Sequence, residues 1–394
     1  MIRFYLSSRN MLLLRTSYKN IISGGKRTWL NVAVLSFVLV IMVAYNGVLD
    51  GWLEEARRDT SEWETAGGQY WHPEYDRYDV FLLQDAHGPV PGKLKRDMSD
   101  AVATPVLVIQ ASLYPQGRMY NIQLKVIDPG QHILKLPTNK IIASDGAIPA
   151  LIGGRMARSA GLAEGDRVMM RWRDKNGVFD AREIVVTSVF DTKVPGVDVG
   201  QVWISIDDMY EMTGMEYEAT YIVTSREEVE RPDTGWDFKD NKFLMADIDM
   251  MEEGVRIEAG IIFIILLAIA LLAVFDTQTL SIFRRQKEIG TYVALGMTPG
   301  RVAGLFTLEG TMYSLFAIVL AIIWGTPVLL LFAHTGMPLP DSYTDIGIAI
   351  GNVLYPSYKP LSILVTIVTL ISMSALISFL PARKITRQNM VQAL

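Results

Sequence analysis

Four long apolar runs dominate the hydropathy pattern of the chain. They lie at 30–48, 259–275, 305–332 and 361–380, and the third is interrupted by Glu309, Gly325 and Pro327. A helix needs roughly 20 residues to cross a bilayer. A single run could be a buried core helix, but four in one chain predict a membrane protein. We expect transmembrane helices at 29–49, 259–280, 303–332 and 361–380.

The first apolar run is predicted to be a retained anchor. A secretory signal has a short basic start, an apolar stretch of about 7–15 residues and a small-residue cleavage site. Here the basic start occupies residues 1–28, and the apolar run is followed by the polar sequence YNGVLDGWLEEARRD. This arrangement favours a helix that stays in the membrane.

Lysine and arginine residues near the membrane predict the orientation, because such residues remain in the cytoplasm. Residues 1–28 carry six basic residues and no acid, the segment 281–302 is mainly basic, and the tail 381–394 carries three basic residues and no acid. The loop 333–360 carries one lysine against two aspartates. Both termini are therefore expected in the cytoplasm, with residues 50–258 and 333–360 outside.

The expected outer segment 50–258 is acidic. It carries 23 Lys and Arg residues against 37 Asp and Glu residues, a net charge of −14, whereas the whole chain carries −5. Nucleic acid is therefore excluded as a partner of this segment. The chain has no cysteine, so no disulfide supports the outer domain.

Mixed patterns within the outer segment predict an α+β domain, in two lobes, inserted between the first two membrane helices. Alternating β-branched and aromatic residues predict strands in PVLVIQASLYPQGRMYNIQLKVID, and small residues predict a helix over 147–162 that ends at Gly161. The segment 166–190 is typical of a hairpin, with Asn176 and Gly177 supplying the positive φ angles of its turn. The sequence QVWISIDDMYEMTG predicts a strand and a short helix.

Helical spacing continues beyond the first two membrane segments on their outer side. Leu49, Trp52, Leu53 and Ala56 follow the first segment, and DIDMMEEGVRIEAG precedes the second. We expect both membrane helices to extend outward as stiff stalks that carry movement between membrane and outer domain. Residues 1–22 show amphipathic spacing and predict either an interfacial basic anchor or a docking helix, within a cytoplasmic segment 1–28.

The chain is poor in catalytic signals. Its four histidines show no HExxH spacing, and no Cys/His set could hold zinc. The sequence ISGGKRT at 22–28 lacks the first glycine and the final Ser or Thr of a phosphate-binding loop. We therefore expect a non-enzymatic subunit without a cofactor of its own.

A short charged segment, RRQKEIGTYVALGM at 284–297, joins the second and third membrane segments. It predicts an amphipathic helix whose apolar face holds Ile289, Tyr292, Val293, Gly296 and Met297. Such a helix, placed between two membrane helices, either fits a groove on a soluble protein or lies on lipid. We place this cytoplasmic coupling segment at 281–302.

This segment resembles the R-E-I-G-x-x-x-A-L-G signature of one group of ABC permeases, and PARKITRQNMVQAL resembles the ending of the same group. The family comprises the lipoprotein-releasing (Lol-type) and macrolide-exporter (MacB-type) permeases and the FtsX division protein. GRMARSAGLAEGDRVMM and SVFDTKVPGVDVGQVWISIDDM resemble Lol-type outer domains more weakly. Lys287 stands where the family usually has Arg, Asp276 lies near a usual Asn position, and Met390 stands where Pro is common.

The resemblance implies a subunit of the bacterial inner membrane with a periplasmic domain and no nucleotide site of its own. ATP and Mg²⁺ would be bound by a separate dimeric ABC ATPase that grips the coupling helix, and a second permease copy or a paralogue would complete the assembly. The residues implied to meet the ATPase are Lys287, Glu288, Ile289, Gly290, Leu295 and Gly296. Glu309 either holds the far end of this helix by hydrogen bonding or lies at the level of the lipid headgroups.

The Lol-like outer segment favours release of lipoproteins from the inner membrane, with lipid, a lipoprotein cargo and a periplasmic carrier or adaptor as further partners. The alternatives are MacB-like export of a peptide or toxin from the periplasm, and FtsX-like activation of a cell-wall hydrolase without transport. An acylated cargo needs an apolar groove, which we expect at the outer ends of the first two membrane helices, near Met42, Val43, Ile262 and Phe263.

Overall fold

The computed structural model describes residues 25–79, 81–142, 146–226, 234–339 and 353–387, which fall into two compact units. The helical unit comprises Met1–Trp52, Glu253–Met337 and Leu354–Leu394, and the sheet unit comprises Leu53–Glu252 and Pro338–Val353. The expected amphipathic helix at 1–22 lies outside the described residues.

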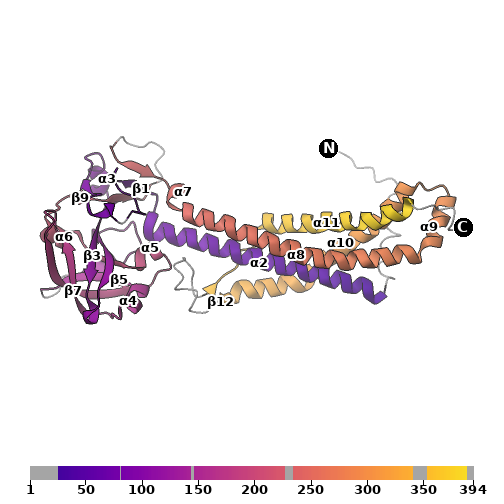
Figure 1. Cartoon of the computed structure of the whole chain (residues 1–394), viewed down its shortest axis with the longest axis horizontal. Coiled ribbons are helices and arrows are strands. Elements are labelled where there is room, and N and C mark those ends of the chain that lie inside the picture. Colours follow the sequence, from indigo (N-terminus) through magenta and orange to yellow (C-terminus); the bar gives the residue numbers. More distant parts are fainter. Residues whose placement is uncertain (1–24, 80, 143–145, 227–233, 340–352, 388–394) are drawn as a thin grey trace. The chain divides into compact units, whose positions relative to one another are not determined.

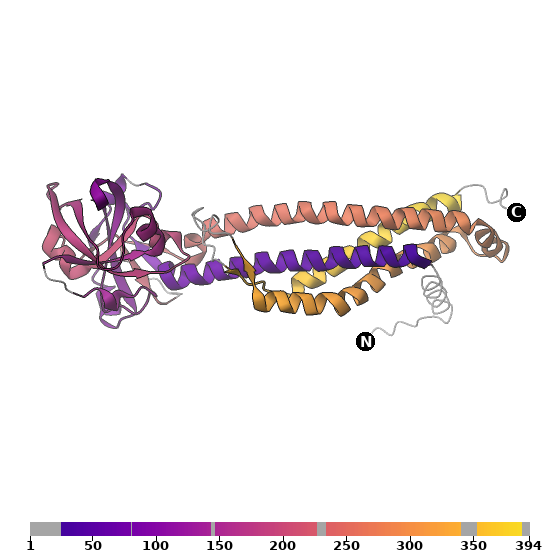
Figure 2. The ribbon, with the colours of Figure 1, turned by 90° about the horizontal axis from the view of Figure 1, so that it is seen from below.

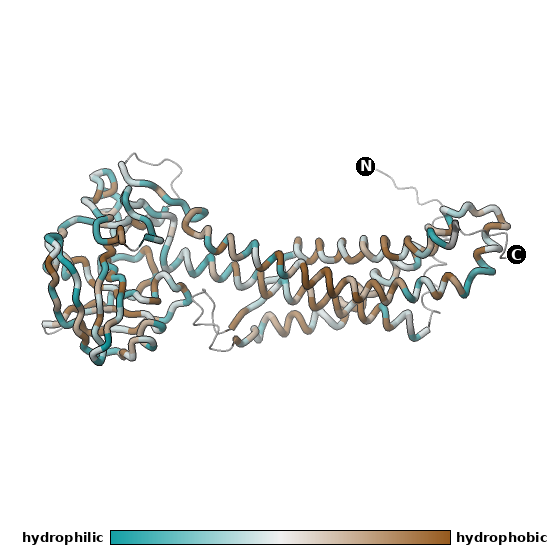
Figure 3. The backbone as a smooth tube through the Cα atoms, in the orientation of Figure 1, coloured by the Kyte–Doolittle hydropathy of each residue, from teal (hydrophilic) through white to brown (hydrophobic). Residues whose placement is uncertain are grey.

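Long helices form the helical unit (Figure 1). They are α2 (Gly25–Thr60), α8 (Ala246–Arg284), α10 (Pro299–Thr335) and α11 (Pro360–Arg387), with the short α9 (Gln286–Ala294) between α8 and α10. Each of the four long helices contains a window apolar enough to cross a membrane. The sequence prediction of four such helices is therefore confirmed, and hydrophobic residues line most of their middle lengths (Figure 3).

The four long helices lie side by side (Figures 1 and 2) and share an apolar core. Val32 and Leu35 of α2, Val274 of α8, Ala317 of α10 and Leu370 of α11 are all buried in this core. Many other apolar side chains of α8, α10 and α11 are exposed, as expected of surfaces that face lipid.

A nine-stranded sheet forms the centre of the sheet unit, in the order β11-β1-β10-β3-β4-β8-β5-β7-β6. The strands are β1 (Gly68–Trp71), β3 (Ala103–Leu113), β4 (Tyr120–Ile127), β5 (Ile148–Gly153), β6 (Arg167–Arg173), β7 (Phe179–Phe190), β8 (Gln201–Ser205), β10 (Tyr221–Thr224) and β11 (Asp237–Lys239). Two-stranded sheets pair β2 (Gly88–Pro89) with β9 (Glu218–Ala219), and β12 (Met337–Pro338) with β13 (Val353–Leu354).

Short helices accompany the sheet. They are η1 (Ser61–Thr65), η2 (Leu82–Gln84), α3 (Lys95–Ser99), η3 (Pro115–Gly117), η4 (Thr138–Lys140), α4 (Gly154–Ala160), α5 (Pro195–Asp198), α6 (Ile206–Thr213) and α7 (Asn241–Leu244). The π-helical η1 follows directly on α2, and α7 precedes α8 after one residue.

Six of the strands close into a barrel, because β6 returns to pair with β3 at residues 111–113. The ring runs β3-β4-β8-β5-β7-β6, and β10, β1 and β11 continue the sheet from the first half of β3. Side chains alternate along β3: Leu107 and Ile109 lie in the barrel core, whereas Val106 and Val108 join a second core on the outer side of the strand. The structure confirms an α+β domain, and its division into two lobes stays a prediction.

One local prediction is confirmed and two are partly wrong. The predicted hairpin is β6–β7, but of the two expected turn residues only Gly177 has a positive φ, +82°, and Asn176 does not, because residues 174–178 form a loop longer than a two-residue turn. The predicted strand and helix at 201–214 are β8 and α6. The helix expected over 147–162 is instead β5 followed by the short α4, which ends at Gly161 as predicted. Its first half is a strand because it fills the place between β7 and β8 in the barrel.

Candidate functional site

The turn from α8 through α9 into α10 forms an elbow in the helical unit. α8 ends at Arg284, and Arg285 at φ −104° and ψ 18° breaks the helix before α9 begins. After α9, Gly296 takes φ +91°, which a residue with a side chain rarely adopts. Thr298 then precedes Pro299, the first residue of α10, where a proline costs no hydrogen bond. The predicted segment 281–302 therefore contains the last residues of α8 and the first of α10 as well as α9.

An arginine clamp fastens this elbow. Nη1 of Arg285 lies 3.0 and 3.3 Å from the two carboxylate oxygens of Glu309, and its Nε donates to Glu288 at 2.7 Å. The guanidinium also lies over the ring of Phe306, 5.1 Å from its centroid. Burial lowers the pKa of Arg285, but the hydrogen bond to Glu288 and the charge of Glu309 outweigh it and leave the pKa raised. The start of α9 is thus tied to the interior of α10.

Glu309 is the buried member of this clamp. Its side chain is only 6% exposed, compared with 17% for Arg285 and 53% for Glu288. A carboxylate this deep is stable only when it is paired. Glu309 accepts from Arg285, directly before α9, and both roles weighed for Glu309 stay predictions. The sequence contained a partial signal, because Arg285 and Glu288 have the i, i+3 spacing of a helical ion pair.

The apolar face of α9 packs against other helices of the same chain. Ile289 is buried together with Ile282, Phe306 and Ala382, and Tyr292, Val293 and Met297 pack against the same cluster. Gly290 is buried as well. Ile289 and Gly290 therefore do not lie on the surface, contrary to what direct contact with an ATPase would require.

The other residues that were predicted to meet an ATPase are exposed on the surface of the elbow. Lys287, Glu288 and Gly296 are exposed, and the side chain of Leu295 is 79% exposed. Phe283, at the end of α8, is also exposed. A charged pair beside two exposed apolar side chains is a surface that another protein can bind.

Close packing joins α10 to α11 just beyond Glu309. A Cβ atom at Gly310 would overlap Oγ of Ser378 and lie 3.2 Å from Nε2 of Gln278. Ser378 donates to the carbonyl of Ser374, one turn earlier in α11. Gln278 and Ser374 are buried, and neither side chain has a hydrogen-bond partner among the described residues. The serines of α11 thus permit close contact between the helices.

The other end of the helical unit is held by an ion pair and a tight backbone contact. Arg256 of α8 donates to Asp50 of α2 at 2.9 Å, and Asp50 is almost fully buried. Gly51 lies against the backbone of Tyr355, and the Ser357 amide donates to the Gly47 carbonyl at 2.8 Å.

The residues of the expected cargo groove lie between the helices. Met42 and Val43 are buried in the shared helix core, and Phe263 packs partly against it. Ile262 is half-buried. These four side chains form no open groove in the described conformation. Asp276, which lies in α8, is exposed on the helix surface.

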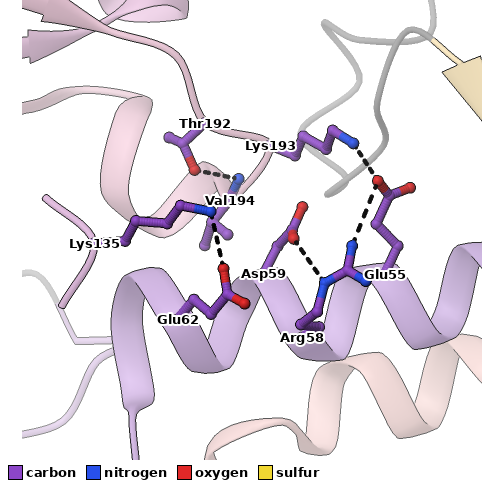
Figure 4. Close-up of polar contacts among 8 residues, drawn as sticks. All are labelled: Glu55, Arg58, Asp59, Glu62, Lys135, Thr192, Lys193 and Val194. Atoms are coloured by element: carbon purple, nitrogen blue, oxygen red, sulfur yellow. Dashed lines mark hydrogen bonds and ion pairs between the residues drawn. The ribbon is translucent and has the colours of Figure 1, made fainter. Parts of the chain in front are cut away.

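In the sheet unit, ion pairs attach the end of α2 to neighbouring loops (Figure 4). Lys193 pairs with Glu55, and Lys135 lies 3.0 Å from Glu62 of η1. The rings of Trp63 and Phe190 stack with centroids 5.7 Å apart. The 190–193 part of this contact belongs to the segment that resembles Lol-type permeases.

A second set of ion pairs joins α2 to the start of α8 within the sheet unit. Arg57 donates to Asp249 at 2.8 Å and also pairs with Glu252. The predicted stalks are thus helical, since α2 extends to Thr60 and α8 begins at Ala246. Ion pairs therefore link the facing sides of the two stalks.

Part of the chain is similar to known permeases. Residues 260–390 match the family described as FtsX-like permease C-terminal. A second match is the ABC transporter permease YtrF of Bacillus subtilis (strain 168), with 29% identity over 167 residues. That alignment covers 40% of this chain and 38% of the relative, so the chain spans less than half of the relative it matches.

These matches confirm the resemblance to this permease family. Residues 260–390, which are similar to the FtsX-like permease C-terminal family, contain the elbow, the arginine clamp and the α10–α11 contact.

Proposed function

We propose that this chain is the permease subunit of an ABC transporter, in which a separate ATPase dimer drives movement of the sheet unit. The observation that carries the proposal is the Arg285–Glu309 clamp within the FtsX-like domain. Because the clamp and the buried Ile289 fix α9 to α10 and α11, a force on α9 displaces the membrane helices rather than bending a loop. ATP and Mg²⁺ belong to the ATPase, and this chain supplies no residue to them.

The ATPase contact in this proposal is the exposed side of the elbow. Lys287, Glu288, Leu295 and Gly296 form it, and Ile289 and Gly290 support it from inside. Leu295 would fill an apolar hollow on the ATPase, and the two charged residues would set its orientation.

Co-purification tests this contact. The full-length chain, expressed in its own host and extracted in mild detergent, should retain an ABC ATPase that mass spectrometry identifies. L295D should lose most of that ATPase, because it places a charge in the apolar contact. K242D, at an exposed position of α7, is the matched control and should retain it. Retention by L295D at the wild-type level would contradict the proposed contact.

Because α2 and α8 are continuous helices, a force applied at the elbow would be transmitted along them. α8 is a single helix from Ala246 to Arg284, and α2 is continuous from Gly25 to Thr60. A helix rises 1.5 Å per residue and resists compression, so displacement at the elbow would reach the far end of α8. At that end Asp249 and Glu252 hold Arg57 of α2, so both helices would move together.

For the cargo we propose a lipoprotein released from the inner membrane towards a periplasmic carrier, with a second permease copy or a paralogue completing the complex. The support is the Lol-like segment around Lys193, which contacts Glu55 at the end of α2. Because Met42 and Val43 are buried, acyl chains would enter only when α2 moves away from α8.

Photocrosslinking tests the cargo. A benzophenone residue at Ile262, which is half-buried on α8, should capture acylated proteins during ATP turnover, whereas the same residue at the exposed Asp276 should not. Capture of an outer-membrane channel adaptor or of a cell-wall hydrolase by the sheet unit would favour export or hydrolase activation instead.

The proposed topology places both termini and the elbow in the cytoplasm and the sheet unit in the periplasm. Because the chain has no cysteine, single-cysteine variants need no background removal. In intact cells whose outer barrier is permeabilised, an impermeant maleimide should label K242C but not K287C. The reverse labelling would invert the topology.

A further inference from the structure

A polar cavity lies within the sheet unit, between the end of the first stalk and the barrel. Its volume is about 170 Å³, and its walls come from η1, β1, β4, α5, β8 and β10. The mechanism proposed above does not use it. The cavity contains a buried lysine, a carboxylate, a guanidinium and two buried polar atoms that lack hydrogen-bond partners.

Lys125 is a buried cation in the wall of this cavity. Its residue is only 5% exposed, although it is a lysine in the middle of β4. Nζ donates to the Gly196 carbonyl at 2.8 Å and lies over the ring of Trp203, 5.0 Å from its centroid. An ammonium has three N–H donors, so two remain for a ligand. Burial lowers the pKa of Lys125 to about 8, which leaves it largely charged at neutral pH.

The Glu64 carboxylate also lines the cavity, but Lys125 forms no ion pair among the residues that the structure describes. The Glu64 carboxylate lies close to Gly196, where an added Cβ would be 2.8 Å from both of its oxygens. The Arg77 guanidinium also lines the cavity and donates to the Leu244 carbonyl at 3.1 Å. The cavity therefore presents both signs of charge.

Two further polar atoms in the walls are unsatisfied. Oγ1 of Thr65 and Oε1 of Gln201 are buried, and neither has a hydrogen-bond partner among the residues that the structure describes. Thr65 is 2% exposed and Gln201 is 7% exposed. Gln201 donates its Nε2 to Gln123 at 3.3 Å, which directs Oε1 away from that bond. An unmade buried hydrogen bond costs about 1–3 kcal/mol, so a protein that keeps two in one cavity is suited to bind a ligand there.

We infer that this cavity binds a small zwitterion, a free amino acid with an apolar side chain. Its carboxylate would accept from Lys125, Arg77 and the hydroxyl of Thr65, and its ammonium would donate to Gln201 Oε1 and Glu64. Trp71, Tyr75 and Tyr221 provide aromatic walls for the side chain. The inference does not rest on the proposed transport function. It makes the ligand a bridge between η1, at the end of α2, and the barrel strands β4 and β8.

The test uses the full-length protein in detergent micelles and three matched probes. Equilibrium dialysis measures retention of radiolabelled L-leucine. Competition then compares 4-methylpentanoate, which lacks the amino group, and isoamylamine, which lacks the carboxylate. L-leucine should be retained saturably, and each competitor should be roughly tenfold weaker, since each leaves one set of charged partners unpaired. Absence of saturable retention, or equal competition by either analogue, would overturn the inference.

Variants locate the site. K125M should weaken retention of L-leucine roughly tenfold or more, whereas K242M, an exposed lysine outside the cavity, should leave it unchanged. T65V is the second variant, because valine matches threonine in shape and the lost hydroxyl makes no bond in the empty protein. T65V should keep the fold and weaken binding severalfold.

A chemical readout ties binding to Lys125 itself. Acetic anhydride should acetylate Lys125 in the empty protein at pH 8, and saturating L-leucine should slow that acetylation as mass spectrometry measures it. Lys242 should react at the same rate with and without leucine. Binding without protection of Lys125, or unaltered binding by K125M and T65V, would place the ligand elsewhere and refute this site.

Discussion

The guanidinium of Arg285 lies 3.0 Å from the carboxylate of Glu309, and this ion pair joins the break between α8 and α9 to the interior of α10. The two residues are 24 positions apart in the sequence. Their ion pair therefore fixes the distance between the two ends of the elbow. Because Glu309 is buried, the contact differs from the weak ion pairs of a protein surface.

Removing one partner of this clamp should destabilise the helical unit. We expect R285Q or E309Q to lower the free energy of unfolding in mixed micelles by about 3 kcal/mol, because each change leaves the other group buried without its charged partner. The double variant R285Q/E309Q should cost clearly less than the sum of the two. R284Q, at the exposed neighbouring position, should change stability by less than about 0.5 kcal/mol. Additive costs would show that the pair does not interact.

Gly310 should tolerate no side chain. G310A would place its methyl group on Oγ of Ser378 and force α10 and α11 apart, at a cost of about 1–3 kcal/mol. G304A is the matched control in the same helix, because nothing lies within 4 Å of its Cβ position. Thermal unfolding should separate the two variants, and S378G should partly rescue G310A. A G310A protein as stable as G304A would mean that α10 and α11 pack differently.

The stability of the sheet unit should rise with pH because of Lys125. The pKa of this lysine is about 8 in the folded protein against an ordinary value of 10.5, so the unfolded chain binds more protons between those values. Linkage then makes folding more favourable as the pH rises from 8 towards 10.5, by about 3 kcal/mol in total. Below pH 8 the penalty of burying the charge is constant.

Comparison with K125M isolates that effect. The difference in unfolding free energy between wild type and K125M should change with pH over 8–10, where wild type gains relative to the variant. Burial raises the pKa of Tyr75 and of Tyr221, which acts in the opposite direction above pH 10 but is common to both proteins. A difference independent of pH would show that Lys125 titrates normally.

The ion pair between Lys193 and Glu55 should restrain the loop that follows β7. Partly exposed pairs contribute about 0.2–1 kcal/mol. We therefore expect K193E to increase amide hydrogen exchange of residues 190–198 about threefold. The reversed pair K193E/E55K should restore protection, and R167Q, which breaks an ion pair on the β6–β7 hairpin, should not affect this loop. Unchanged exchange in K193E would show that the stacking of Trp63 on Phe190, and not the ion pair, holds this loop.

The membrane helices and the β6–β7 hairpin could be predicted because their signals are local. Apolar runs and the glycine of the hairpin loop, Gly177, depend only on neighbours in the sequence. The strand β5 could not, since the small Ala150 and the glycine at 153 fit either structure, and only pairing with β7 and β8 makes residues 148–153 a strand.

The elbow and the cavity were only partly predictable for the same reason. The amphipathic pattern of α9 identified an apolar face, but not that Ile289 packs against Phe306 of its own chain rather than an ATPase. In β4 the alternation places Asn121, Gln123 and Lys125 on one face, which would normally face water. Lys125 is buried because η1 and α5, both distant in sequence, cover that face.

Closure of the barrel has a consequence for how the sheet unit avoids aggregation without disulfides. With β6 paired back onto β3, the described part of the nine-stranded sheet ends at β11, which has only three residues, two of them charged. Such an end offers little template for strand addition by a neighbouring chain. The domain is therefore protected from aggregation through its edges, even when many copies are crowded together in one membrane.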